Sequence, residues 1–91
     1  MSVMLVQYDL YAPGQDYAPL IKAIESYTHS KCLKSAYFID TQDTPAAVRD
    51  RLMKLIDRND VLFVVGLTES WGANRQTPST DWLLSPSRTW S

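Results

Sequence analysis

The spacing of hydrophobic and polar positions changes period several times along the chain. Ser2 to Asp9 and Val61 to Leu67 are strand-like runs that are apolar on both faces, which predicts strands covered on two sides. The spacing is helical from Asp16 to about Thr28, and again from Thr44 to about Arg58. The strand formers from Lys31 to Gln42 predict one bent strand or a tight pair of strands.

The two helical segments carry start signals and apolar stripes. Asp16 is placed to cap the first helix, and Thr44 precedes Pro45, a residue favoured at the first helical position. The predicted buried stripe of the first helix comprises Tyr17, Leu20, Ile21, Ile24 and Tyr27. That of the second comprises Val48, Leu52, Leu55 and Ile56.

The order of these elements predicts the fold class. Strand, helix, strand pair, helix and strand is the βαββαβ order of an α+β, ferredoxin-like sandwich, with two helices on one face of an antiparallel sheet. We expect this domain over residues 1–69 and a polar C-terminal extension over residues 70–91, packed on the domain or on a dimer partner. In the extension, we expect a short strand or turn near Trp71 and one helical turn from Asp81 to Leu84.

The sheet face opposite the helices needs a cover. A second copy of the chain could supply it, because 91 residues are few for an independent core, and we therefore expect a homodimer. The alternative is a monomer that buries this face under its own tail, using Trp71, Trp82 and Trp90. In either arrangement, Trp82 is expected to be packed.

Composition narrows the classes of partner. The net charge is −1, so no overall positive field attracts a polyanion, and nucleic-acid binding would need a local patch. A single-stranded nucleic acid, short RNA or nucleotide is therefore a better candidate than long duplex DNA. The lone Cys32 excludes an intrachain disulfide and a cysteine-cluster metal site, which fits a reduced, cytoplasmic setting. The N-terminal apolar run breaks at Gln7, so neither a membrane span nor a targeting segment is predicted.

A single acid, Asp9, ends the first apolar strand just before the turn through Pro13 and Gly14. Such a residue either marks the point where the strand meets water or holds a cation or proton for chemistry. One carboxylate is a poor site for Mg²⁺, but two Asp9 side chains of a dimer and a substrate phosphate would suffice. Without a cation, two close carboxylates would share a proton.

Three segments resemble a known family. The stretches "MLVQYDL", "KSAYFIDT" and "LIDRNDVLFVVGL", in this order and spacing, resemble the second core protein of CRISPR adaptation modules and its SinR-like and virulence-associated-D-like relatives. The similarity runs from Met1 to about Trp71 and is closest to the SinR-like branch. That branch shares the "YDL…PG…Y" opening and a Leu-Thr-Glu/Gly-x-Trp end to the last strand, seen here in Leu67, Thr68, Glu69 and Trp71.

The resemblance implies a ferredoxin-like homodimer in which Asp9 faces its symmetry mate. In several members of the CRISPR family, this acid is held to bind a divalent metal, Mg²⁺ or Mn²⁺, and to support phosphodiester cleavage, while other members are non-catalytic scaffolds for DNA. Family members that grip DNA carry basic patches. Here the basic side chains alternate with the acids Asp50 and Asp57, and this mixture disfavours a role as a scaffold for duplex DNA. The basic side chains are Lys31, Lys34, Arg49, Arg51, Lys54 and Arg58.

Other candidate residues carry weaker signals. Ser35, at the predicted bend, could donate a hydrogen bond to a phosphate, and Tyr11 could stack on a base, although such residues more often serve the backbone or the core. His29 and Cys32 have no partners in any recognisable catalytic pattern. Two classes of function remain: a metal-dependent nuclease that uses paired Asp9 residues, and a non-catalytic dimer that binds nucleic acid, nucleotide or protein.

Overall fold

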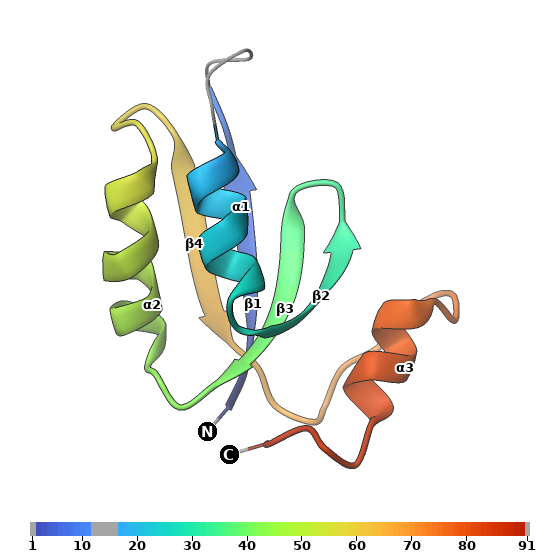
Figure 1. Cartoon of the computed structure of the whole chain (residues 1–91). Helices are drawn as coiled ribbons and strands as arrows, with labels where there is room; N and C mark the ends of the chain where they lie inside the picture. Colours follow the sequence, from blue (N-terminus) through green and yellow to red (C-terminus); the bar gives the residue numbers. More distant parts are fainter. Residues whose placement is uncertain (1, 12–16, 91) are drawn as a thin grey trace.

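The computed structural model describes residues 2–11 and 17–90 as one sheet with helices packed around it (Figure 1). In chain order, the elements are β1 (Ser2–Asp9), α1 (Ala18–Glu25), β2 (Thr28–Leu33), β3 (Ala36–Thr41), α2 (Pro45–Leu52), the 3-10 turn η1 (Met53–Leu55), β4 (Val61–Gly66) and α3 (Pro78–Leu84).

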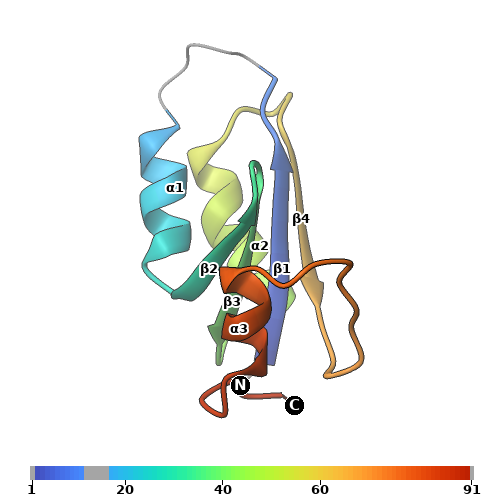
Figure 2. The same ribbon diagram turned by 90° about the vertical axis from the view of Figure 1, so that its right-hand side faces the viewer.

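The four strands form one antiparallel sheet in the order β2-β3-β1-β4. In the central strand β1, Val6 lies opposite Tyr37 of β3 and Val64 of β4. Helices α1 and α2 lie together against the sheet, whereas α3 lies apart from them, beside β2 (Figures 1 and 2). The protein is therefore a small α+β fold, compatible with the predicted ferredoxin-like sandwich and extended by a third helix.

The core lies between the sheet and helices α1 and α2. Alternate residues of β1 point into it because successive side chains of a strand face opposite sides. The fully or almost fully buried cluster comprises Met4, Val6, Tyr8, Leu20, Ile24, Tyr37, Ile39, Val48 and Leu52. The predicted helix stripes supply Leu20 and Ile24 from α1 and Val48 and Leu52 from α2 to this cluster.

The segment expected to be a bent strand or a strand pair is the pair β2–β3, joined by a turn at Lys34 and Ser35. The pair begins three residues earlier than predicted, at Thr28, which we had expected to be helical. Helix α1 ends instead at Glu25, where the N–H of Tyr27 closes a tighter turn on the carbonyl of Ile24 (3.1 Å). The predicted cap Asp16 lies outside the described residues.

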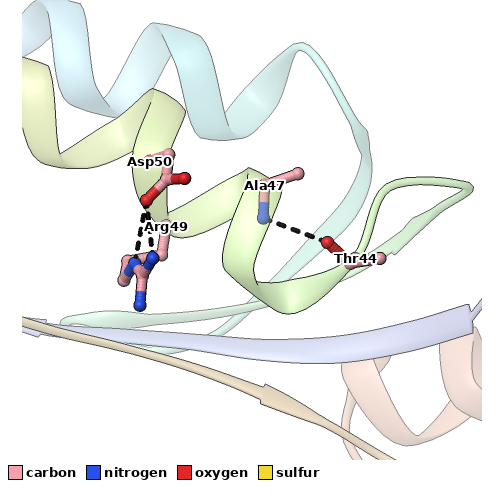
Figure 3. A network of polar contacts seen from close by, with 4 residues as sticks. All are labelled: Thr44, Ala47, Arg49 and Asp50. Atoms are coloured by element: carbon pink, nitrogen blue, oxygen red, sulfur yellow. Dashed lines mark hydrogen bonds and ion pairs between the residues drawn. The ribbon is translucent and has the colours of Figure 1, made fainter.

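Helix α2 begins as predicted and ends early. Thr44 Oγ1 accepts a hydrogen bond from the N–H of Ala47 at 3.1 Å (Figure 3). The predicted end near Arg58 is wrong, because the backbone becomes extended at Ile56 after the 3-10 turn. Leu55, expected in the buried stripe, is exposed for the same reason.

Charge pairing on α2 joins residues that are adjacent in the sequence. Asp50 pairs with Arg49 at 2.7 Å, and both partners are largely exposed (Figure 3). An exposed pair of this kind contributes at most about 1 kcal/mol to stability. The pair nevertheless leaves Arg49 less available to bind a phosphate.

The C-terminal extension is better ordered than predicted. Helix α3 is longer than the single expected turn because Thr77 caps it, in a reciprocal arrangement with Thr80. Near Trp71, the described chain forms no strand. The predicted packing of Trp82 is confirmed, since its ring stacks on that of Phe38 with centroids 6.4 Å apart.

The sheet face opposite α1 and α2 is covered unevenly. On the β3 side, Val3 and Ala36 are buried and Trp82 lies over Phe38. On β4, Val61, Phe63 and Val65 remain exposed, Phe63 to 63%. The single chain therefore covers β4 on one face only, and the second cover that was predicted for it is not supplied by the described residues.

Candidate functional site

Asp9 lies at the end of β1 on the unevenly covered face of the sheet. By strand alternation it shares this face with Gln7, and the register places Val61 opposite Asp9 and Phe63 opposite Gln7. These four residues and Val65 are all exposed, and we call them the exposed β1–β4 face. A shallow cavity of about 320 Å³ is lined by Gln7, Tyr8, Asp9, Val61 and Phe63.

The structure brings the other two predicted site residues to the same end of the sheet. The N–H of Tyr8 donates to the carbonyl of Ser35 at 3.0 Å, so the β2–β3 turn lies beside the end of β1. Tyr11 follows two residues after Asp9, and its side chain is 71% exposed. Asp9, Tyr11 and the turn that carries Ser35 thus lie at the same end of the sheet.

Asp60, which the sequence analysis did not single out, organises this edge. Its Oδ1 accepts hydrogen bonds from the N–H of Tyr11 (2.6 Å) and the hydroxyl of Tyr17 (3.0 Å). Its Oδ2 accepts one from the N–H of Asp57 (2.8 Å). Desolvation alone would raise the pKa of Asp60, but these three donors stabilise the charged form and lower the pKa below its usual value. Asp60 therefore ties the segment after β1 to the turn before β4.

The donor set at this edge is suited to a hard cation only in part. The Asp9 carboxylate is an oxygen ligand of the kind that Mg²⁺ and Mn²⁺ prefer, and its exposure leaves it open to a second copy or a phosphate. Within residues 2–11 and 17–90, no three His, Cys, Asp or Glu side chains group together as a metal site. A cation here would need the second Asp9, substrate oxygens and water as further ligands.

The contacts of His29 and the burial of Cys32 are typical of residues with a structural role. His29 lies near the far end of β2, where its Nδ1 is 2.9 Å from the carbonyl of Tyr27 and its ring is tilted against Tyr37. Cys32 is half-buried, and desolvation raises the pKa of its thiol. A thiol with a raised pKa is a poorer nucleophile at neutral pH. His29 lies away from the Asp9 end of the sheet.

A second polar anchor that the sequence analysis missed holds the C-terminal segment. Asp40 of β3 is buried and accepts hydrogen bonds from both the hydroxyl and the N–H of Thr89, the latter at 2.8 Å. Ser79 of α3 is buried beside β2, within 2.7 Å of Ser30 Oγ, and its hydroxyl also donates to the carbonyl of Lys31 at 3.2 Å. The extension is therefore fixed to the sheet at two places.

Comparison with known proteins adds no assignment: no family model matches the chain, and neither the curated proteins nor the solved structures contain a match. Among the described helices, none has the length and apolar character needed to cross a membrane.

Proposed function

We propose that the protein is a ferredoxin-like homodimer that cleaves RNA or DNA phosphodiesters, with Asp9 of each copy holding Mg²⁺ or Mn²⁺ between the subunits. The main support for the proposal is the position of Asp9. This residue ends β1 and lies opposite Val61, the first of the exposed apolar residues along β4. The strand order β2-β3-β1-β4 and the resemblance of the N-terminal motif to CRISPR-associated adaptation proteins support the same arrangement.

The exposed β1–β4 face suits contact with a second copy. Burying a large apolar side chain such as Phe63 contributes about 1.5–3 kcal/mol, and β4 is also an edge strand with unpaired backbone groups. In a two-fold interface the same patch meets itself, and Asp9 of one copy approaches Asp9 of the other when the two-fold axis passes near the Asp9 end of the face. The acid thus lies at the rim of the surface that a dimer would cover.

The residues at this edge have distinct roles in the proposed reaction. A bound divalent cation would lower the pKa of a water ligand and stabilise charge on the phosphate. The two Asp9 carboxylates would hold the cation, the Ser35 hydroxyl would donate to a phosphate oxygen, and the Tyr11 ring would stack on a base. Water adds to phosphorus and loses a proton to solvent, the P–O bond to the leaving oxygen breaks, and that oxygen takes up a proton from solvent.

Cleavage assays with an Asp9 variant test this function. Purified protein is incubated with labelled single-stranded RNA, single-stranded DNA and duplex DNA, with Mg²⁺, Mn²⁺ or EDTA. We expect metal-dependent cleavage of a single-stranded substrate by the wild type and at least about a hundredfold loss in Asp9→Asn. Asp43→Asn, which removes another exposed acid, should keep full activity. Equal cleavage by the wild type and Asp9→Asn would show that the activity is a contaminant.

The second candidate is a non-catalytic dimer that binds nucleic acid, nucleotide or protein. It is favoured by an aromatic and cationic cavity in the C-terminal extension, remote from Asp9 in the sequence and lined by Trp71, Arg88 and Trp90. In this case, Asp9→Asn leaves binding unchanged.

A further inference from the structure

The C-terminal extension forms a cavity of about 340 Å³ with the chain that follows β4. Its lining combines an acid, an arginine and two tryptophans with aliphatic and small residues: Glu69, Trp71, Leu83, Leu84, Ser85, Pro86, Arg88 and Trp90. The volume of this cavity lies within the usual range for small-molecule sites, and its lining is more polar than that of most such sites.

Arg88 is held in place but is not fully paired. Its guanidinium carbon lies 4.0 Å from the centre of the Trp82 ring, a cation–π contact that fixes the side chain. Two of its nitrogens, Nε and Nη1, are buried and have no hydrogen-bond partner within the described chain. Leaving buried charged donors unpaired is costly, so Arg88 is a guanidinium beside the cavity whose need for an acceptor is unmet within the described chain.

Glu69 lines the same cavity without pairing with Arg88. No ion pair joins the two in the part of the chain that the structure describes, and Glu69 is exposed. The cavity therefore presents a carboxylate acceptor and a guanidinium donor separately. Trp71 and Trp90 are half-buried, so part of each indole remains accessible to a planar ligand.

We propose that this cavity binds a guanine nucleotide. Guanine is the base that presents two adjacent donors, N1–H and the N2 amino group, on its Watson–Crick edge, and a carboxylate such as Glu69 accepts both at once. The phosphate accepts hydrogen bonds from Arg88, and the base stacks on Trp71 and Trp90. This assignment names the ligand class of the second candidate function and does not depend on cleavage at Asp9.

Tryptophan fluorescence of the full chain tests the proposal directly. GMP, AMP, CMP, UMP and guanosine are titrated separately into the wild type at moderate salt, with correction for absorption by the nucleotide. We expect saturable quenching by GMP at a concentration about tenfold lower than for AMP or UMP, and weaker binding of guanosine, which lacks the phosphate. Equal affinity for all four nucleotides, or no saturable change at millimolar GMP, would overturn it.

Variants assign each contact. Glu69→Gln, at an exposed position, should remove most of the preference for GMP over AMP, while the matched change Asp57→Asn, beyond the other end of β4, should not. Arg88→Lys should weaken GMP binding while leaving guanosine binding nearly unchanged, and the matched Arg58→Lys should alter neither. If Arg88→Lys lowers the melting temperature, its weaker binding could come from lost stability. The preference of Glu69→Gln for GMP over AMP then decides whether the cavity recognises guanine. Unchanged GMP preference in Glu69→Gln contradicts the assignment.

The test separates this inference from the proposed nuclease. Asp9→Asn should bind GMP as the wild type does, because Asp9 does not line the cavity. Loss of cleavage with retained GMP binding supports both proposals, and GMP binding without any cleavage supports the cavity alone. Cleavage without GMP binding overturns the cavity and leaves the Asp9 proposal in place.

Discussion

At the scale of single residues, two aspartates join segments that are far apart in the sequence. Asp60 receives hydrogen bonds from Tyr11, 49 positions away, and from Tyr17, 43 positions away. Asp40 binds Thr89, also 49 positions away. A carboxylate can do this because it is acceptor-only and offers up to about four lone-pair directions, so backbone N–H groups and hydroxyls converge on it.

Asp60→Asn should destabilise the protein in a pH-dependent way. The folded pKa of Asp60 lies below its usual value of 3.8, so its contribution is complete above that value and is lost as the pH falls through the lower folded pKa. The urea midpoint of Asp60→Asn should therefore lie below that of the wild type at pH 7, and the gap should narrow below about pH 4. Urea unfolding at pH 7, 5 and 3 measures this.

Asp57→Asn is the matched control, because the carboxylate of Asp57 accepts no hydrogen bond from the described residues, although its N–H binds Asp60. Its urea midpoint should stay close to that of the wild type at pH 7. A gap between the wild type and Asp60→Asn that is the same at pH 7 and pH 3 would mean that the charge of Asp60 contributes nothing.

Thr89→Val removes the hydroxyl that donates to the buried Asp40 and keeps the shape of the side chain. Because hydrogen bonds to charged groups contribute more than neutral ones, we expect a loss of about 1–3 kcal/mol in the free energy of unfolding. Thr89→Ser, which retains the donor, should lose much less. Denaturant titration of both variants decides the point, and equal stability would show that the N–H of Thr89 is sufficient.

At the scale of elements, apolar alternation predicted β1 and β4 well because it depends on adjacent residues alone. The Thr44-Pro45 cap likewise predicted the start of α2. The same Thr-Pro signal at Thr77-Pro78 would have predicted α3, yet we placed only one turn there, starting at Asp81. Local capping chemistry is thus readable from sequence, even where apolar periodicity is weak.

The ends of helices and the polar anchors could not be predicted in this way. Helix α2 passes into a 3-10 turn after Leu52, and the turn before β4 is closed by hydrogen bonds between Asp57 and Asp60. The candidate residues Asp9, Ser35 and Tyr11 were all predicted and do lie at one edge, but Asp60, Asp40 and Arg88 were missed. The partners Tyr11 and Tyr17 of Asp60 and the partner Thr89 of Asp40 are distant in sequence, so no local pattern marks these two acids. Arg88 contacts Trp82, which is near it in sequence, but it lies beyond the end of α3.

The packing of α3 on the sheet predicts the effect of losing Trp82. Its ring stacks on Phe38 and carries the Arg88 guanidinium, so Trp82→Ala removes two contacts together. We expect a loss of roughly 1–3 kcal/mol and faster hydrogen exchange across residues 78–90. Leu84→Ala, an exposed position on the same helix, is the control and should be nearly neutral. If Trp82→Ala is equally neutral, α3 does not stabilise the sheet.

At the scale of the whole molecule, the sheet face opposite α1 and α2 has two parts. The chain's own tail covers one part, and the other part is open to a second copy. The chain's own tail covers the β3 side through Trp82 and Thr89, as the monomer alternative anticipated. It leaves the β4 side open, where Val61, Phe63 and Val65 are exposed. A second copy therefore has a defined place to bind, and it need not displace the tail.

This division leads to a test of the homodimer. Phe63→Asp places a charge at the centre of the exposed β1–β4 face, where a two-fold interface would bring two such charges together in a water-poor contact. Since Phe63 is 63% exposed in the single chain, the change should cost the monomer little. We expect light scattering at micromolar concentration to give a dimer mass for the wild type and a monomer mass for Phe63→Asp, with similar melting in dilute solution.

Leu33→Asp provides the matched control for this test. Leu33 is as exposed as Phe63, at 65%, but it ends β2, on the opposite edge of the sheet. It should therefore keep the dimer mass. A monomer mass for the wild type would refute the dimer and, with it, the pairing of Asp9 residues on which the nuclease proposal depends. A dimer that Phe63→Asp leaves intact and Leu33→Asp dissociates would move the interface to the β2 edge, too far from Asp9 for the two acids to share a cation.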